Sequence, residues 1–212
     1  MFLYDCFRMF NRSSQLRRLE MAHKVFIGDL TTNALMKFPV LEELNLYAII
    51  ISKEEIETVG RYCPMLKTLK VNRRAWRPRV SETDEGSLMR FNENAIAIGQ
   101  NLPKLRHLEL IGNSMTNIGL RVILDNCHHL ETLDLRECFR IDLKGDLGKQ
   151  CSKQIKYLKL PNDSLEGCPY LWIISKEDYQ DSGDNNDGYD SDEVTLHDFG
   201  VYVDGFDDLL DK

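Results

Sequence analysis

The feature that most constrains this chain is a pattern, apolar-x-x-apolar-x-apolar, that occurs six times. The first positions of successive copies lie 25, 25, 39, 25 and 25 residues apart, so the long interval is one repeat with 14 additional residues. All eighteen pattern positions are apolar and fifteen are Leu. A regular period of this length is the signature of stacked units, each too small to bury its own apolar side chains. The eighteen residues are Leu16, Leu19, Met21, Leu41, Leu44, Leu46, Leu66, Leu69, Val71, Leu105, Leu108, Leu110, Leu130, Leu133, Leu135, Ile155, Leu158 and Leu160.

The second half of each unit has the spacing of a helix. Ser52 and Glu55 are placed as a capping box, and Ile56 and Val59 follow on one helical face. The fourth unit repeats this arrangement with Thr116 as N-cap and with Leu120 and Ile123 on the inner face. Three places before a first anchor stands Phe38, Cys63, Leu102 or Cys127, so cysteine alternates with large apolar residues at that position. These patterns predict one short strand and one helix per repeat.

We therefore expect an α/β fold of the leucine-rich-repeat solenoid type, a right-handed βα superhelix with a curved parallel sheet. It should occupy residues 1–175, with about six repeats, an insertion near 73–92 and a C-terminal cap at 167–174. The fifth unit carries Gly145 and Gly148, which make a helix there less favourable.

Residues 176–212 differ from the rest in composition. They contain thirteen Asp or Glu and two Lys, whereas the first 175 residues have a small excess of basic over acidic side chains. Such a segment buries too little apolar surface to offset the entropy of ordering, so we expect an acidic disordered tail. Its scattered apolar residues could alternatively fold against a partner or back onto the repeats: Phe199, Val201, Tyr202, Phe206, Leu209 and Leu210.

The compartment is expected to be the cytoplasm, the nucleus or both. Asp5 and Arg8 interrupt the apolar opening of the chain before the core of a signal peptide could form, and no uncharged run is long enough for a membrane span. Six cysteines are present, and without a secretory signal they are expected to be reduced and packed.

Residues that alternate with the anchors along each strand should point away from the core, onto the concave face where such solenoids bind partners. One row comprises Arg18, Glu43, Thr68, His107, Thr132 and Tyr157, and the next comprises Glu20, Asn45, Lys70, Glu109, Asp134 and Lys159. Their mixed charge favours a protein partner and argues against a nucleic-acid groove. The alternative is that they are ordinary solvated residues of a sheet.

A basic cluster with one aromatic residue lies in the insertion, at Arg73, Arg74, Trp76, Arg77 and Arg79. It could bind phosphate, an acidic partner or the chain's own acidic tail. The alternative is a solvated loop.

Catalytic, cofactor and metal sites are not predicted. His128 and His129 beside Cys127 lack the spacing of zinc ligands, and the chain has no C-x-x-C pair. Neither a phosphate-binding glycine loop nor a G-x-S-x-G elbow occurs. We therefore expect a binding protein and not an enzyme.

The repeats resemble those of a known family. Residues 130–138, LETLDLREC, resemble the cysteine-containing leucine-rich repeat of F-box proteins. Residues 105–113 (LRHLELIGN), 116–120 (TNIGL), 145–151 (GDLGKQC) and 160–164 (LPNDS) are similar to a plant subgroup of F-box/leucine-rich-repeat proteins. This resemblance implies recognition of a protein substrate for a Skp-cullin-F-box ubiquitin ligase.

One departure from the family bears on partners. The residues before Leu16 hold no Leu-Pro-x-Glu start of an F-box, the segment that docks the Skp adaptor. We expect a family member without its F-box, through truncation, a shortened gene model or genuine loss, which would recruit Skp only if an F-box is supplied elsewhere. The alternative function is an acidic-tailed nuclear leucine-rich-repeat protein that binds histones or other basic proteins.

Overall fold

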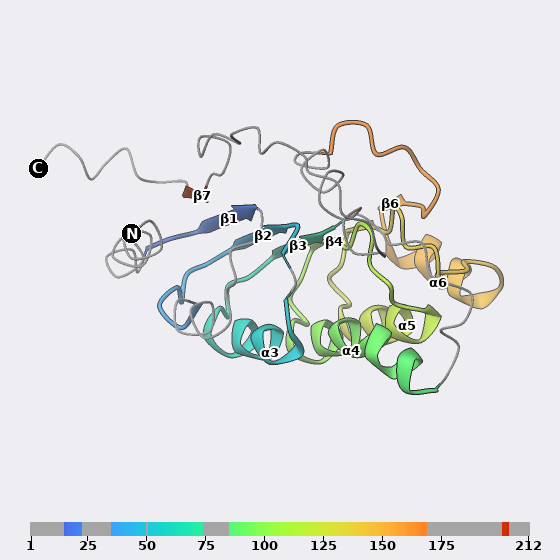
Figure 1. The fold of residues 1–212 in the computed structure, drawn as a ribbon, viewed down its shortest axis with the longest axis horizontal. Helices are drawn as coiled ribbons and strands as arrows, with labels where there is room; N and C mark the ends of the chain where they lie inside the picture. The colour runs from blue at the N-terminus through green and yellow to red at the C-terminus, as the bar shows by residue number, and fades with distance from the viewer. Residues whose placement is uncertain (1–14, 23–34, 50, 74–84, 169–200, 204–212) are drawn as a thin grey trace, which may run out of the picture.

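The computed structural model describes residues 15–22, 35–49, 51–73, 85–168 and 201–203. In these residues a sheet forms one side of the molecule and a row of helices the other (Figure 1). The strands are β1 (Arg18–Ala22), β2 (Glu43–Tyr47), β3 (Thr68–Asn72), β4 (His107–Glu109), β5 (Thr132–Asp134), β6 (Tyr157–Lys159) and β7 (Val201–Val203). The helices are α3 (Lys53–Tyr62), α4 (Glu85–Asn101), α5 (Asn117–Asn126) and α6 (Asp146–Gln154).

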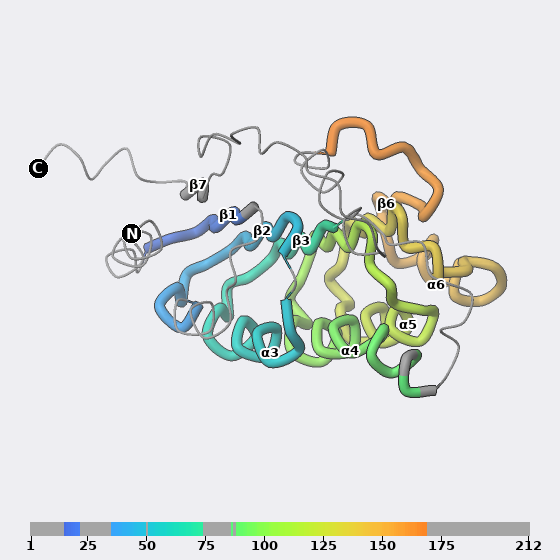
Figure 2. Tube along the Cα trace, in the orientation of Figure 1, coloured from blue at the N-terminus to red at the C-terminus, as the bar shows by residue number. Residues whose placement is uncertain are grey.

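The sheet confirms the repeat pattern strand by strand. Its order is β6-β5-β4-β3-β2-β1-β7, and β1 to β6 pair as parallel neighbours. The central anchors lie directly opposite one another, for example Leu44 opposite Leu69 and Leu108 opposite Leu133. The chain thus advances by one strand per repeat, as the tube in Figure 2 shows, and the predicted leucine-rich-repeat architecture is confirmed.

Local sequence signals start the helices as expected. Ser52 accepts a hydrogen bond from the backbone N–H of Glu55, and the Glu55 carboxylate accepts one from the Ser52 N–H at 2.7 Å, which completes the capping box. Thr116 caps α5 by accepting from the Ile118 N–H at 3.3 Å. The predicted inner residues of α3 and α5 are all buried: Ile56, Val59, Leu120 and Ile123.

The core consists of the anchors of stacked repeats together with the inner faces of the helices. Sixteen of the eighteen anchors are buried, and the two exceptions are in the last repeat, where Leu158 is partly buried and Leu160 is 44% exposed. No described strand pairs with the far side of β6. Without a further repeat stacked there, the apolar side chains of this unit are only partly covered.

Two units differ from the expectations in detail. Part of the predicted insertion at 73–92 is helical, because α4 begins at Glu85 and has 17 residues where the other helices have 9 or 10. The fifth unit forms helix α6 despite its two glycines. Gly145 stands at the N-cap with φ 74°, a conformation that glycine adopts without steric cost, and no side chain caps this helix.

Glycines allow the helices of neighbouring repeats to approach closely. A Cβ atom on Gly60 of α3 would lie 2.6 Å from the backbone oxygen of Asn101 in α4. One on Gly99 of α4 would lie 2.8 Å from the backbone oxygen of Val122 in α5. At both positions the obstacle is backbone, so any larger residue would push two repeats apart.

Most of the predicted tail, like the predicted cap beyond Cys168, lies outside the described residues. The exception is β7, which pairs antiparallel with β1. Apart from these three residues, the disorder predicted for 176–212 concerns residues outside the described part of the chain. Among the described helices, none combines the length and apolar character that crossing a bilayer requires.

Candidate interaction surface

The twelve residues predicted for the concave face form two rows across the parallel strands. In the first row the partners run Arg18, Glu43, Thr68, His107, Thr132 and Tyr157. In the second they run Glu20, Asn45, Lys70, Glu109, Asp134 and Lys159. We call this side of the sheet, opposite the core anchors, the polar sheet face. It arises because successive side chains of a strand project to opposite sides while the anchors occupy the other side.

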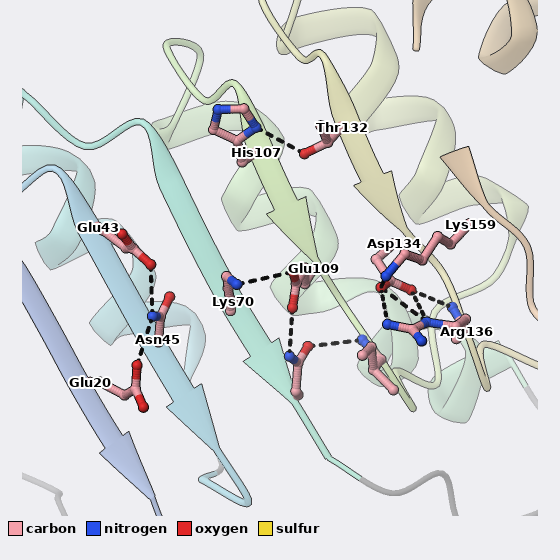
Figure 3. A network of polar contacts seen from close by, with 12 residues as sticks. Glu20, Glu43, Asn45, Lys70, His107, Glu109, Thr132, Asp134, Arg136 and Lys159 are labelled. Atoms are coloured by element: carbon pink, nitrogen blue, oxygen red, sulfur yellow. Dashed lines mark hydrogen bonds and ion pairs between the residues drawn. The ribbon is translucent and has the colours of Figure 1, made fainter. Parts of the chain in front are cut away.

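Three clusters of polar side chains lie on this face (Figure 3). The first cluster links strand β1 to strand β2. The Asn45 side-chain amide donates to Glu43 at 2.8 Å and to Glu20 at 3.2 Å, and Arg18 forms an ion pair with Glu20 at 3.0 Å. Asn45 is fully buried, and its side-chain carbonyl Oδ1 accepts no hydrogen bond from the described residues. The cluster therefore holds two carboxylates close together through one amide and one guanidinium.

The second cluster joins β3 to β4. Lys70 Nζ lies 3.1 Å from one oxygen of Glu109, and the Asn72 amide donates to the other oxygen at 2.9 Å. The side-chain carbonyl of Asn72 in turn accepts a hydrogen bond from the backbone N–H of Ile111 at 3.2 Å. Further along the face, His107 Nδ1 lies 3.0 Å from Thr132 Oγ1. These bonds fix side chains in the middle of the sheet.

The third cluster is a buried ion pair at the C-terminal end of the face. Arg136 Nη2 lies 2.6 Å from Asp134 Oδ2, and both side chains are almost fully buried. Lys159 Nζ approaches the same carboxylate at 3.3 Å, and Arg136 also donates to the carbonyl of Ser164 at 2.7 Å. Burial alone would raise the pKa of Asp134, but the hydrogen bonds and charge of Arg136 outweigh it and hold that pKa below its usual value.

Exposure on the polar sheet face is greatest at its two ends. The side chain of Arg18 is 45% exposed at one end, and Lys159 is 53% exposed and Tyr157 60% exposed at the other. Lys156 lies over the Tyr157 ring, 5.0 Å from its centroid. Tyrosine and arginine are enriched among residues that dominate binding energy at protein interfaces, so these ends are the parts of the face best suited to contact a partner.

A third row at the ends of the strands was not predicted. Tyr47 and Asn72 follow Asn45 and Lys70 in the same alternation and pair in register, and Arg136 stands two residues beyond Asp134. All three are buried. Extending the alternation by one more step along each strand would have identified them.

The basic segment is described only at Arg73. Its Nη2 donates to Ser114 Oγ at 2.9 Å, and its backbone N–H donates to the carbonyl of Ile111 at 2.9 Å. Burial lowers the pKa of this guanidinium. Arg73 is therefore held against the turn of the next repeat and does not extend into a solvated loop. Arg74, Trp76, Arg77 and Arg79 lie outside the described residues.

The described cysteines are free thiols that pack within the repeats. Cys63, Cys127 and Cys138 donate to backbone carbonyls 25 or 28 residues away, in the preceding repeat: Cys63 to Leu35, Cys127 to Leu102 and Cys138 to Leu110. Burial raises the pKa of Cys63 and Cys127 to about 11 and that of Cys138 to about 12. A thiol so far from ionising is a poor nucleophile.

Groups that could support chemistry do not gather in the described residues. No set of three or more His, Cys, Asp or Glu side chains is arranged there to hold a metal ion. His128 and His129, singled out beside Cys127, are exposed on the turn that precedes β5. What this part of the chain offers is a structured polar surface.

Comparison with known proteins gives consistent results. Residues 6–88 match the family model described as FBD-associated F-box protein At5g56370, LRR repeats. Putative F-box/LRR-repeat protein 22 of Arabidopsis thaliana is 42% identical over 88% of this chain and 58% of its own length. F-box protein SKIP19 of the same plant is 39% identical over 92% of this chain and 58% of its own length. Putative F-box/LRR-repeat protein 23 is 46% identical over 73% of this chain and 33% of its own length.

These percentages show how much of each chain is shared. The matches cover most of this chain, whereas the chain spans between a third and three fifths of these three relatives. The family model covers residues 6–88, which include the strands β1, β2 and β3 of the polar sheet face.

Proposed function

Because this chain belongs to the plant F-box/leucine-rich-repeat proteins, we propose that its polar sheet face recognises a protein substrate for a Skp-cullin-F-box ubiquitin ligase. The observation that carries this proposal is the register of the two rows across six parallel strands. Solenoids typically bind partners on the extended surface that such a sheet provides. The chain would act by binding, and the ubiquitin transfer would be carried out by other subunits.

The charges of the face favour a protein over a nucleic acid. Arg18, Lys70, Arg136 and Lys159 are balanced by four acidic residues, Glu20, Glu43, Glu109 and Asp134. Nearly all of these groups already pair with one another. A surface without excess positive charge gives a phosphate backbone little attraction, whereas a protein with its own mixed charges can match it in sign and position.

Affinity should be concentrated at the C-terminal end of the face. Tyr157 supplies a large, exposed aromatic surface, and Lys159 lies two residues away on the same strand. The clusters around Asn45 and Asp134 are internally bonded, so they would orient their neighbours more than they would contact the substrate. The residues proposed to contact the partner are thus a subset of the twelve predicted ones.

Recruitment of the ligase depends on an F-box. Skp and cullin subunits would join this chain where an F-box is present on the same polypeptide or is supplied by another protein. The cytoplasm and nucleus are the proposed compartments.

The proposed function can be tested by adding an F-box to this chain. The tagged chain and a fusion with an F-box placed before residue 1 are expressed in plant cells with the proteasome inhibited, and the co-purifying proteins are quantified by mass spectrometry. The proposal expects both baits to retain a common set of proteins. Skp and cullin subunits, and ubiquitin on the retained proteins, should increase with the fusion. If no retained protein gains ubiquitin with the fusion, the proposal is wrong.

The alternative, binding of histones or other basic proteins through the acidic tail, gives a different result in the same experiment. Histones would then be the main proteins retained, and removal of residues 176–212 would abolish their capture. Retention of a specific set that survives this removal would favour the polar sheet face.

A further inference from the structure

The outer edge of β1 is one of the two places in this sheet, with the far side of β6, where an additional strand could pair. One side of β1 pairs with β2 along five residues. The other side would present unpaired backbone N–H and C=O groups, which natural sheets cover or disrupt because other chains pair with them readily. Leu19 and Met21 of β1 are nonetheless buried, as their counterparts in the interior repeats are.

This edge is occupied by a segment distant in the sequence. Val201–Val203 forms β7, which lies beside β1 (Figure 1). It pairs antiparallel with β1, in a sheet whose other described strands are all parallel. Val203 lies opposite Leu19, Tyr202 opposite Glu20 and Val201 opposite Met21. The two valines are thus in register with the two buried residues of β1.

The composition of the segment suits this role. Val and Tyr have high β propensity, and here they form a triplet between Asp198 and Asp204 in a tail that is otherwise mainly acidic and polar. Charged residues that flank an edge strand discourage further strands and aggregation. A short apolar strand between acids therefore fits an edge cap better than a packed core element.

We infer that the outer edge of β1 is a strand-acceptor surface and that Val201–Val203 of the same chain is its resident occupant. A protein that adds an extended segment to this edge by β-augmentation would first have to displace β7. This inference is independent of whether the polar sheet face recognises a ligase substrate.

The length of the connection is compatible with pairing within one molecule. Thirty-two residues separate Cys168 from Val201, and a chain of that length can span up to roughly 100 Å. Five strand spacings separate β6 from β1, about 24 Å at the usual distance between strands. The connection is therefore long enough for Val201–Val203 to reach the outer edge of β1 in the same molecule.

Hydrogen exchange on the full-length chain tests the inference. The variant Val201→Pro/Val203→Pro removes two backbone donors from β7, and Ser182→Pro/Asp187→Pro is the matched control elsewhere in the tail. We expect the peptide that covers β1 to exchange about tenfold faster in the first variant. It should be unchanged in the control, as should the peptides that cover β3 to β5 in both. Unchanged exchange at β1 in the first variant would overturn the inference.

Sedimentation distinguishes pairing within one molecule from exchange between copies. The wild-type chain and the Val201→Pro/Val203→Pro variant should both be monomers over the concentrations used. A wild-type dimer that dissociates in the variant would mean that β7 pairs with β1 of a second copy, and the assignment to the same chain would be wrong.

Discussion

The carboxylate of Asp134 and the guanidinium of Arg136 form a buried ion pair, with Oδ2 and Nη2 2.6 Å apart, at the polar surface of a sheet. Asp134 and Arg136 thus neutralise each other's charge on the side of the sheet where polar side chains would otherwise face solvent. The pair also joins repeats, because Arg136 donates to the carbonyl of Ser164 and Lys159 approaches Asp134 from β6. It therefore fixes the C-terminal end of the proposed recognition surface.

Replacing one member of this ion pair should lower the free energy of unfolding more than replacing both members. Asp134→Leu leaves Arg136 buried without its counter-charge, and such a loss typically destabilises a protein by about 3–5 kcal/mol. Asp134→Leu/Arg136→Met replaces both charges with apolar groups of similar volume and should remain within about 1 kcal/mol of wild type. Urea denaturation of the three proteins gives the free energies of unfolding. Equal destabilisation by the single and double variants would contradict this account.

The same pair should make stability depend on acid. The pKa of Asp134 in the folded chain lies below its usual value of 3.8. Its contribution to stability is therefore complete at neutral pH, and it is lost as the pH falls from about 4 through the folded-state pKa. Between pH 6 and pH 3 the wild-type chain should lose more free energy of unfolding than the Asp134→Leu/Arg136→Met variant does. If the two lose the same amount, the ion pair does not stabilise the fold.

Equivalent leucines in different repeats should differ in importance. Leu110 is fully buried, whereas Leu160, at the same position two repeats later, is 44% exposed. Leu110→Ala should destabilise the chain by about 2–5 kcal/mol, and Leu160→Ala should cost less than about 1 kcal/mol. Thermal and urea unfolding of both variants measure the difference. Similar losses would mean that the last repeat is covered as fully as the others.

The buried cysteines should be unreactive in the folded chain. At pH 8 a thiol with a pKa of about 11, as at Cys63 and Cys127, has a thiolate fraction lower than that of a free cysteine by about a hundredfold or more. Labelling with a disulfide reagent, followed by peptide mapping, should leave these two residues and Cys138 and Cys151 unmodified until denaturant is added. Cys168, which is less buried, is the internal comparison. Rapid labelling of Cys63 or Cys127 in the native chain would contradict the packing role.

Much of the fold could be predicted because its determinants are local and repeated. The anchors of a repeat fix the strand and its register, since a slip of one residue would turn every leucine to the other side. Ser52 and Glu55 mark the start of α3 within four residues of sequence. These signals depend on near neighbours or on a constant period.

What could not be predicted depends on neighbours that do not follow the period. Asn45 and Asp134 alternate correctly with the anchors, yet both are buried, because Glu43, Glu20 and Arg136 happen to stand beside them. The pairing of β7 with β1 joins residues about 180 positions apart, and the composition of the tail favoured disorder. The helical part of the insertion gave no repeat signal, because it has no counterpart in other units.

The most direct test of the recognition surface compares two matched double variants on opposite sides of the solenoid. Tyr157→Ala/Lys159→Ala alters the exposed end of the polar sheet face, and Tyr62→Ala/Lys53→Ala removes the same residue types from helix α3. Each variant is compared with the wild-type chain for the amounts of the co-purifying proteins, after circular dichroism has verified that it is folded. The account predicts that the proteins retained by the wild type are reduced about tenfold or more by the first variant, as expected for loss of an interface hot spot, and are unchanged with the second. Equal retention by the wild type and the Tyr157→Ala/Lys159→Ala variant would contradict it.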